Sequence, residues 1–242
     1  MGKENKKIFI IGFNKCGTRT LSKYFESQGL GTYHIGRDWY PFSCQLTDNM
    51  ANRKKILDSY EHDVYADHAF LVRYYKRLDK DYPGSLFILN TRDVDDWLIS
   101  RLNHHWCTMV PAYNVRTGHR NLNWKQWVAD WRVQWAEHHK DVKKFFSNRP
   151  SDLLIFNINN DDVQKIIDFC LPDYNFNESG WGHSGETLKR QELYFSKING
   201  EIVNIKKPPE RARPFDPWHI ELKMVTTSIS TKHMITDPKE EL

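Results

Sequence analysis

The fold class of this chain can be inferred from a stretch near its N-terminus, Ile8-Phe9-Ile10-Ile11-Gly12-Phe13-Asn14-Lys15-Cys16-Gly17-Thr18. It begins with an apolar run typical of a buried strand, turns between two glycines, and continues into a helical pattern. Such a strand, turn and helix direct backbone N–H groups and the positive helix end at an anion. The stretch therefore predicts a phosphate-binding loop. The alternative is a glycine turn that merely joins a strand to a helix.

The position of the lysine distinguishes this loop from that of a nucleotide kinase. In the pattern G-x-x-x-x-G-K-[ST] the lysine follows the second glycine, but here Gly17 is followed by Thr18 and Lys15 stands inside the loop. A kinase would lack its phosphate-gripping lysine and would depend on Thr18 or Thr20 for Mg²⁺. Ordinary ATP chemistry is therefore disfavoured, and a divergent kinase or phosphotransferase stays as an alternative.

Outward from this loop, short apolar runs alternate with helical segments. This alternation predicts an α/β fold, a three-layer sandwich with a central, mostly parallel sheet. The expected strands cover residues 8–13, 32–35, 64–66, 86–90 and 152–156. The expected helices cover residues 18–28, 48–60, 70–80, 94–103, 121–147 and 161–170, and residues 39–42 are expected in a loop.

The pattern changes after residue 170. Two strand-like runs, residues 192–198 and 201–205, flank Asn199-Gly200, which is the signature of a type I′ hairpin. We expect residues 1–170 to form the core and residues 171–242 to form a C-terminal extension with this β-hairpin, packed on the same domain. A further strand is expected over residues 218–224.

Composition restricts the class of ligand and the compartment. The 242 residues carry a formal net charge of +4, which suits an anionic ligand but not nucleic acid. The four cysteines have neither disulfide nor metal-ligand spacing, so we expect no metal. The N-terminal apolar run is too short for a signal peptide or a membrane span. We expect a cytoplasmic protein.

The loop also resembles a known family. Lys15-Cys16-Gly17-Thr18-Arg19-Thr20-Leu21 is similar to the pattern K-x-G-T-x-x-L, the 5′-phosphosulfate loop of sulfotransferases that use 3′-phosphoadenosine 5′-phosphosulfate (PAPS). The resemblance implies that Lys15 is the catalytic cation, at the oxygen that bridges phosphorus and sulfur. It also implies that Lys15, Cys16, Gly17, Thr18, Arg19 and Thr20 line the 5′-phosphate. A fixed ammonium at the leaving oxygen would stabilise the transition state as charge builds there.

A second motif follows the expected core strand over residues 86–90. Arg92 comes directly after this strand, and Ser100 stands eight residues later in an expected helix. This spacing resembles the 3′-phosphate motif of the same family, so the resemblance implies that Arg92 and Ser100 bind the 3′-phosphate of PAPS. Val94 stands where many members have proline. The alternative is a strand-end ion pair with Asp93 as a helix cap.

The base that would activate a hydroxyl acceptor is expected after the strand over residues 64–66. In the family it ends the strand between the two phosphate motifs, and here Asp67 and His68 follow that strand. We favour Asp67, because relatives with a similar Lys-Cys-Gly-Thr loop carry aspartate there. Alternatively, Asp67 caps the next helix and His68 packs in the core. His104 and His105 are weaker candidates for acceptor binding.

The resemblance implies a sulfotransferase that moves a sulfuryl group from PAPS to a hydroxyl acceptor, a small molecule or a glycan. The product would be adenosine 3′,5′-bisphosphate. A non-catalytic nucleotide-binding module, whose hairpin recruits a partner, is another alternative. The pair His138-His139 lies beside tryptophans on the long helix, where we expect a solvated helix face rather than a metal site. The acceptor, the role of the C-terminal third and the oligomeric state stay open.

Overall fold

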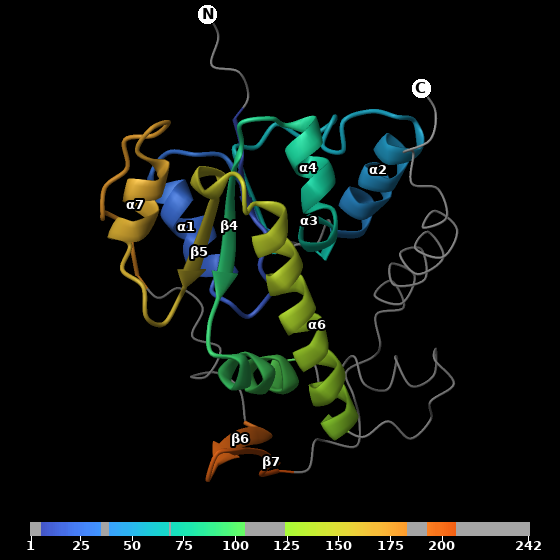
Figure 1. The fold of residues 1–242 in the computed structure, drawn as a ribbon, viewed down its shortest axis with the longest axis vertical. Coiled ribbons are helices and arrows are strands. Elements are labelled where there is room, and N and C mark those ends of the chain that lie inside the picture. The colour runs from blue at the N-terminus through green and yellow to red at the C-terminus, as the bar shows by residue number, and fades with distance from the viewer. Residues whose placement is uncertain (1–5, 35–38, 68, 105–123, 183–192, 207–242) are drawn as a thin grey trace, which may run out of the picture.

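A five-stranded parallel sheet forms the centre of the protein (Figure 1). The structure is a computed structural model that describes residues 6–34, 39–67, 69–104, 124–182 and 193–206. The strands are β1 (Ile8–Ile10), β2 (Thr32–His34), β3 (Val64–Ala66), β4 (Leu86–Thr91) and β5 (Leu153–Asn157). Their order across the sheet is β2-β3-β1-β4-β5, and each adjacent pair is parallel. The predicted α/β class is confirmed.

Helices cover both faces of the sheet and make the three layers (Figure 1). The helices are α1 (Thr18–Ser27), α2 (Trp39–Ala51), α3 (Ala69–Arg73), α4 (Tyr75–Asp81), α6 (Trp124–Phe145) and α7 (Gln164–Cys170), and residues 94–104 are also helical. Ile8 and Ile10 of β1 pack with α1 and α7, whereas Phe9 and Ile11 pack with α2, α3, α4 and the end of α6. This alternation follows from the two-residue period of a strand.

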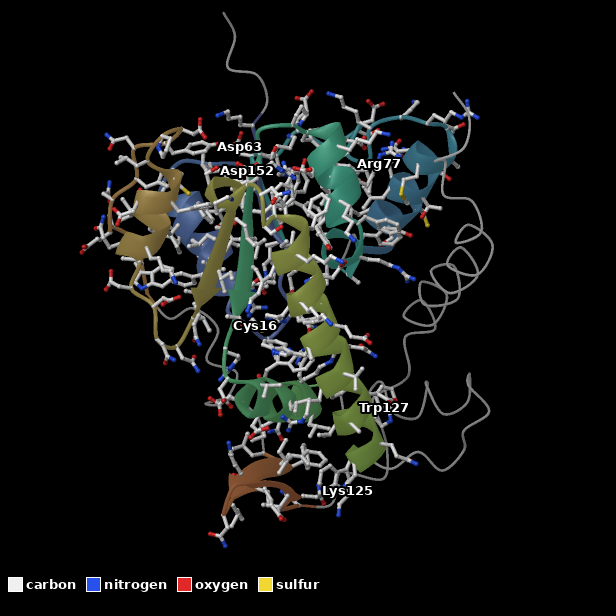
Figure 2. All side chains as sticks on the ribbon, viewed as in Figure 1. Cys16, Asp63, Arg77, Lys125, Trp127 and Asp152 are labelled. Carbon is white, nitrogen blue, oxygen red and sulfur yellow. The ribbon has the colours of Figure 1, made fainter. Side chains whose placement is uncertain are left out.

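A third apolar cluster lies beyond the carboxyl ends of the strands. It joins the loop, the helix of residues 94–104, the first half of α6 and the hairpin; its buried members are Cys16, Trp97, Leu98, Leu102, Trp127, Trp131 and Phe195. Figure 2 shows Cys16 at the carboxyl end of β4 and Asp63 and Asp152 at the opposite end of the sheet. The long helix α6 therefore serves two clusters, one with each half of its length.

The predicted C-terminal hairpin is present. Strands β6 (Phe195–Ile198) and β7 (Glu201–Asn204) pair antiparallel, and both turn residues have positive φ, 50° at Asn199 and 84° at Gly200. These angles are what a type I′ turn requires. The hairpin is tied to the helix of residues 94–104 through Asn103, which donates to the Phe195 carbonyl at 3.0 Å and accepts from the Tyr194 N–H at 2.8 Å. The strand expected over residues 218–224 lies outside the described residues.

Two helix predictions were wrong. The helix expected over residues 48–60 is α2, which begins at Trp39 and ends at Ala51, so the expected loop over residues 39–42 is its first turn. Proline is tolerated in a first turn, where Pro41 stands, and Phe42 and Leu46 are fully buried one helical turn apart. The helix expected over residues 70–80 is divided at Tyr74 into α3 and α4.

A search for helices that could cross a membrane gave none within the described ranges, because no helix there is both long and apolar enough.

Candidate active site

The loop between β1 and α1 is held in shape by one side chain of β4. The Gly12 N–H donates to the Asn90 amide oxygen at 2.8 Å, and the Asn90 amide nitrogen donates to the Cys16 carbonyl at 3.0 Å. Asn90 is fully buried. A Cβ on Gly12 would lie 2.0 Å from the Asn90 carbonyl oxygen, so only glycine allows the two strands to approach this closely.

The loop ends at the amino terminus of α1. Gly17 is the N-cap residue with φ 79°, and no side chain caps this helix end. A Cβ on Gly17 would also lie 2.4 Å from the Ile158 side chain. The N–H groups of a first helical turn have no partners inside the helix and are available to an anion. The two glycines thus allow close packing on Asn90 and Ile158, and the loop leads into a helix end without a side-chain cap.

Lys15 stands at the top of this loop in a left-handed conformation, with φ 66°. Such a conformation is strained for a non-glycine residue and is typical of functional sites. Burial lowers the pKa of the Lys15 ammonium, with Asp67 acting against this and Arg19 and Arg92 adding to it. The Arg92 guanidinium also donates to the Lys15 carbonyl at 3.3 Å. Lys15 is therefore near both a carboxylate and an arginine.

Asp67 directly follows β3, and its backbone is also left-handed, with φ 61°. One carboxylate oxygen, Oδ2, lies 3.5 Å from His34 Nε2, and the Thr18 hydroxyl donates a hydrogen bond to the carboxylate. The other oxygen, Oδ1, is buried without a hydrogen-bond partner in the described structure. Burial raises the pKa of Asp67, against the opposing effects of His34, Thr18, Lys15 and Arg19. A carboxylate with a raised pKa is a stronger base.

The sequence analysis missed His34. It ends β2, which pairs with β3 so that His34 is level with Ala66, next to Asp67. His34 Nε2 also lies 3.4 Å from the Thr18 hydroxyl oxygen. The position of His34 at the end of an expected strand was one sign of a role in the site, because open α/β sheets bind ligands at the carboxyl ends of their strands. What was missing was the strand order that puts β2 beside β3.

Arg92 follows β4 and faces the same loop. Its Nε is buried with no hydrogen-bond partner among the described residues, and its Nη2 lies 3.9 Å from an Asp96 carboxylate oxygen. The helix that follows is capped by Asp93, whose Oδ1 accepts from the N–H groups of Asp95 and Asp96 at 3.0 and 3.1 Å. Asp93 therefore caps this helix, as the alternative account of this motif expected. Ser100 is half-buried farther along this helix.

Of the other predicted site residues, Cys16 is buried under the loop and Thr20 is buried in α1, while Arg19 and His104 are exposed. Burial raises the pKa of the Cys16 thiol, so this cysteine is no nucleophile at neutral pH. His68 and His105 lie outside the described residues. Within the described ranges, no group of three or more His, Cys, Asp or Glu side chains is arranged to hold a metal ion.

The prediction of a solvated face at His138 and His139 was wrong. His138 Nε2 lies 2.8 Å from the Ile11 carbonyl at the end of β1, and its N–H is the donor. His139 Nε2 lies 3.1 Å from the Thr91 hydroxyl at the end of β4. Burial lowers the pKa of both rings, to about 4 for His139. These two neutral histidines attach α6 to the strand ends that carry the loop and Arg92.

The fold and the site define the class: an α/β protein with a glycine-bounded loop between β1 and α1 at the carboxyl end of its parallel sheet. A family model described as a sulfotransferase domain matches residues 7–181. Since the match covers well over half of the chain, the protein belongs to this sulfotransferase family, and a general sulfotransferase activity is supported.

Other comparisons add little. A crystal structure of a sulfotransferase from Alicyclobacillus acidocaldarius is similar, with a TM-score of 0.41 and 17% sequence identity, over 76% of this chain and 88% of that chain. A search of curated proteins found no match.

Proposed function

We propose that the protein transfers a sulfuryl group from PAPS to a hydroxyl acceptor by in-line displacement, leaving adenosine 3′,5′-bisphosphate. The observation that carries this proposal is the convergence of Lys15, Asp67 and Arg92 after β1, β3 and β4. Asp67 and Arg92 are both close enough to Lys15 to change the pKa of its ammonium. A base, a cation for the leaving oxygen and a cation for a second phosphate are thereby gathered at one edge of the sheet.

The residues present fit a nucleotide with phosphates at two positions. The amino end of α1 has no side-chain cap, and its first N–H groups suit a 5′-phosphate. The unpartnered Nε of Arg92 is a buried donor that needs an acceptor, which suits a 3′-phosphate. We propose that Lys15, Gly17, Thr18, Arg19 and Thr20 hold the former and that Arg92 and Ser100 hold the latter.

When bound, PAPS would supply a sulfur atom whose bond to the 5′-phosphate oxygen breaks as the acceptor oxygen attacks. We propose that Lys15 holds its ammonium at that leaving oxygen and stabilises the growing charge. Asp67 takes the acceptor proton onto its carboxylate, and its raised pKa favours this transfer. His34 fixes the orientation of Asp67 through Oδ2, so that the unpartnered Oδ1 is available to the acceptor.

The test is thermal stabilisation by adenosine 3′,5′-bisphosphate in parallel with ADP and ATP. A ligand at a hundred times its Kd stabilises the folded state by about 2.7 kcal/mol. We expect the bisphosphate to raise Tm more than ADP or ATP at equal concentration, and Arg92→Ala to remove that preference. Arg77→Ala, at the opposite end of the sheet, serves as the control that keeps it. Equal stabilisation of the wild-type protein by all three nucleotides would overturn the proposal.

Turnover separates the proposal from phosphotransfer. We expect sulfate-ester formation from PAPS to be unaffected by added EDTA. A requirement for Mg²⁺ together with use of ATP would instead favour a divergent kinase.

A further inference from the structure

A second buried cation lies behind the loop. Arg101, on the helix of residues 94–104, lies over two indole rings: its guanidinium carbon is 5.1 Å from the centre of the Trp97 ring and 4.4 Å from that of Trp131. Both tryptophans belong to the third cluster, together with Cys16 of the loop. Trp97 also donates from Nε1 to the Asn14 carbonyl at 3.0 Å, so one of the two rings is bonded to the loop itself.

Arg101 lacks the partners that a buried guanidinium usually has. Its Nε and Nη1 are shielded from solvent, and neither has a hydrogen-bond partner in the described structure. Burial lowers the pKa of Arg101 to about 10, which still leaves the group charged at neutral pH. A buried charge without a partner destabilises a fold by several kcal/mol, and stacking on aromatic rings compensates only part of this.

Arg149, at the other end of the sheet, is a second arginine that lies over aromatic rings, and its guanidinium forms ion pairs. It also stacks on two aromatic rings, with its guanidinium carbon 5.6 Å from the Phe145 ring and 5.3 Å from the Phe146 ring. Unlike Arg101, it forms ion pairs, with Asp79 at 2.8 Å and Asp152 at 3.1 Å. Both arginines thus lie over two aromatic rings, but Arg149 is more exposed and has two ion pairs, whereas the less exposed Arg101 has none in the described structure.

We propose that Arg101 is a further determinant of anion binding, whose charge acts from behind the loop on a phosphate or sulfate group held between Lys15 and Thr20. The inference rests on the proposed function, which makes the loop the 5′-phosphate site. The field of a charge in a poorly hydrated cluster is weakly screened, so it reaches across the loop backbone to a bound anion. The anion is the partner that Arg101 lacks in the free protein.

The test compares Arg101→Met with wild type, using isothermal calorimetry and Tm without ligand. We expect the Kd for adenosine 3′,5′-bisphosphate to rise about tenfold, which is 1.4 kcal/mol. The Kd for adenosine 3′-monophosphate, which has no 5′-phosphate, should stay within about twofold. Tm without ligand should be equal to or above that of wild type, because a buried unpaired charge is removed. Arg101→Lys, which keeps the charge, should lie closer to wild type than to Arg101→Met.

Arg149→Met is the matched control. We expect it to lower Tm, since it leaves Asp79 without its partner, and to leave both Kd values unchanged. Arg101→Gln is a second neutral variant, read in the same way should Arg101→Met be too unstable to purify.

The inference is overturned if neutral variants of Arg101 bind the bisphosphate as tightly as wild type, or if they lose affinity equally for the 3′-monophosphate. Failure of the proposed function would be seen differently, in wild-type protein that does not prefer the bisphosphate to ADP. In that case ADP, which also carries a 5′-phosphate group, replaces the bisphosphate in the comparison of wild type with Arg101→Met.

Discussion

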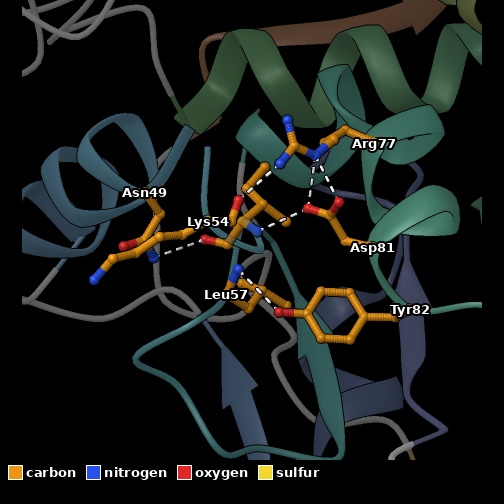
Figure 3. Close-up of polar contacts among 7 residues, drawn as sticks. Asn49, Lys54, Leu57, Arg77, Asp81 and Tyr82 are labelled. Atoms are coloured by element: carbon orange, nitrogen blue, oxygen red, sulfur yellow. Dashed lines mark hydrogen bonds and ion pairs between the residues drawn. The ribbon is translucent and has the colours of Figure 1, made fainter. Parts of the chain in front are cut away.

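The two ends of the parallel sheet differ in how their charged side chains are partnered. At the amino end, Arg77 Nε donates to both Asp81 oxygens at 2.7 Å, and Asp81 also accepts from the Ile56 N–H at 2.8 Å (Figure 3). At the carboxyl end, Asp67, Arg92 and Arg101 each have at least one buried oxygen or nitrogen without a hydrogen-bond partner in the described residues. The two ends are built from the same strands.

Polar groups that are fully paired within the protein have a structural role, whereas buried groups left unpaired are candidates for ligand binding. A buried polar atom left unpaired costs about 1–3 kcal/mol. In the described part of the chain, the Asp and Arg side chains with such an atom all lie at the carboxyl end, whereas Ser22 and His62 lie elsewhere. Asp81 accepts three hydrogen bonds, so an aspartate in this fold can be fully paired where its role is structural. We infer that the unpaired hydrogen-bond donors and acceptors at the carboxyl end are there to bind substrates.

The largest expected effect comes from two lysines, one at each end. Lys15→Met should lower kcat by about 10³-fold, because a preorganised cation at the leaving oxygen is lost. Lys7→Met removes the amino-end ammonium that donates to the His62 carbonyl at 2.7 Å, and should lower Tm while kcat stays unchanged. Steady-state kinetics and thermal melts measure both. If Lys7→Met were as inactive as Lys15→Met, the distinction between the two ends would fail.

Next come two aspartates. Asp67→Asn should lower kcat by about 10²-fold while the Kd for adenosine 3′,5′-bisphosphate changes little, because a base acts on the acceptor. Since the pKa of Asp67 is raised, the acid limb of the kcat profile in wild type should lie at higher pH than for an ordinary aspartate. Asp81→Asn, the amino-end control, should reduce stability and leave kcat unaltered. An Asp67→Asn enzyme with normal kcat would rule out this base.

Two asparagines sharpen the comparison further. Asn90→Leu leaves the Gly12 N–H and the Cys16 carbonyl unpaired and should lower the free energy of unfolding by about 2 to 3 kcal/mol. Nucleotide affinity should fall with it. Asn49→Leu removes the amino-end bond to the Ile56 carbonyl at 3.1 Å, and should reduce stability without a change in affinity. Denaturant titration and calorimetry measure the two quantities; unchanged affinity in Asn90→Leu would contradict the loop assignment.

The smallest effect is a pH dependence of stability from His139. The folded protein holds its pKa at about 4, below the usual 6.5, so the folded state binds fewer protons than the unfolded state. Stability should therefore be fully present above pH 6.5 and fall by roughly 1 to 2 kcal/mol as pH drops towards 4, allowing for the partial exposure of the ring. His139→Gln should flatten this part of the curve. A variant that keeps the wild-type slope would assign it to another group.

The loop and the strand ends were predictable because their signals are local. One continuous stretch contains β1, both glycines, Lys15 and the start of α1, so spacing alone predicts their proximity. The positions of Arg92 and Asp67 at strand ends were predictable in the same way, because each directly follows an apolar strand, whereas their expected roles came from the family resemblance. The register of the hairpin was likewise predictable, because Asn199-Gly200 defines the turn type.

The features that were missed depend on contacts between distant segments. His34 becomes part of the site only because β2 pairs with β3. This strand order cannot be predicted from a local sequence pattern. His138 and His139 were assigned to solvent because helical periodicity gives a face but not its partner, and the strand ends they contact lie 127 and 48 residues away in sequence. The start of α2 was missed because its first turn is aromatic and contains proline, a composition typical of loops.

The amide of Asn90 also has a consequence for the order of assembly. It closes the loop from a strand 78 residues beyond Gly12, so the loop has its binding shape only after β4 has joined β1. If the loop binds a nucleotide as proposed, a nascent chain that ends before β4 would contain the whole signature from Ile8 to Thr18 and yet bind none. The ligand therefore cannot guide the early steps of folding. It selects and stabilises only chains whose central strands are already in register.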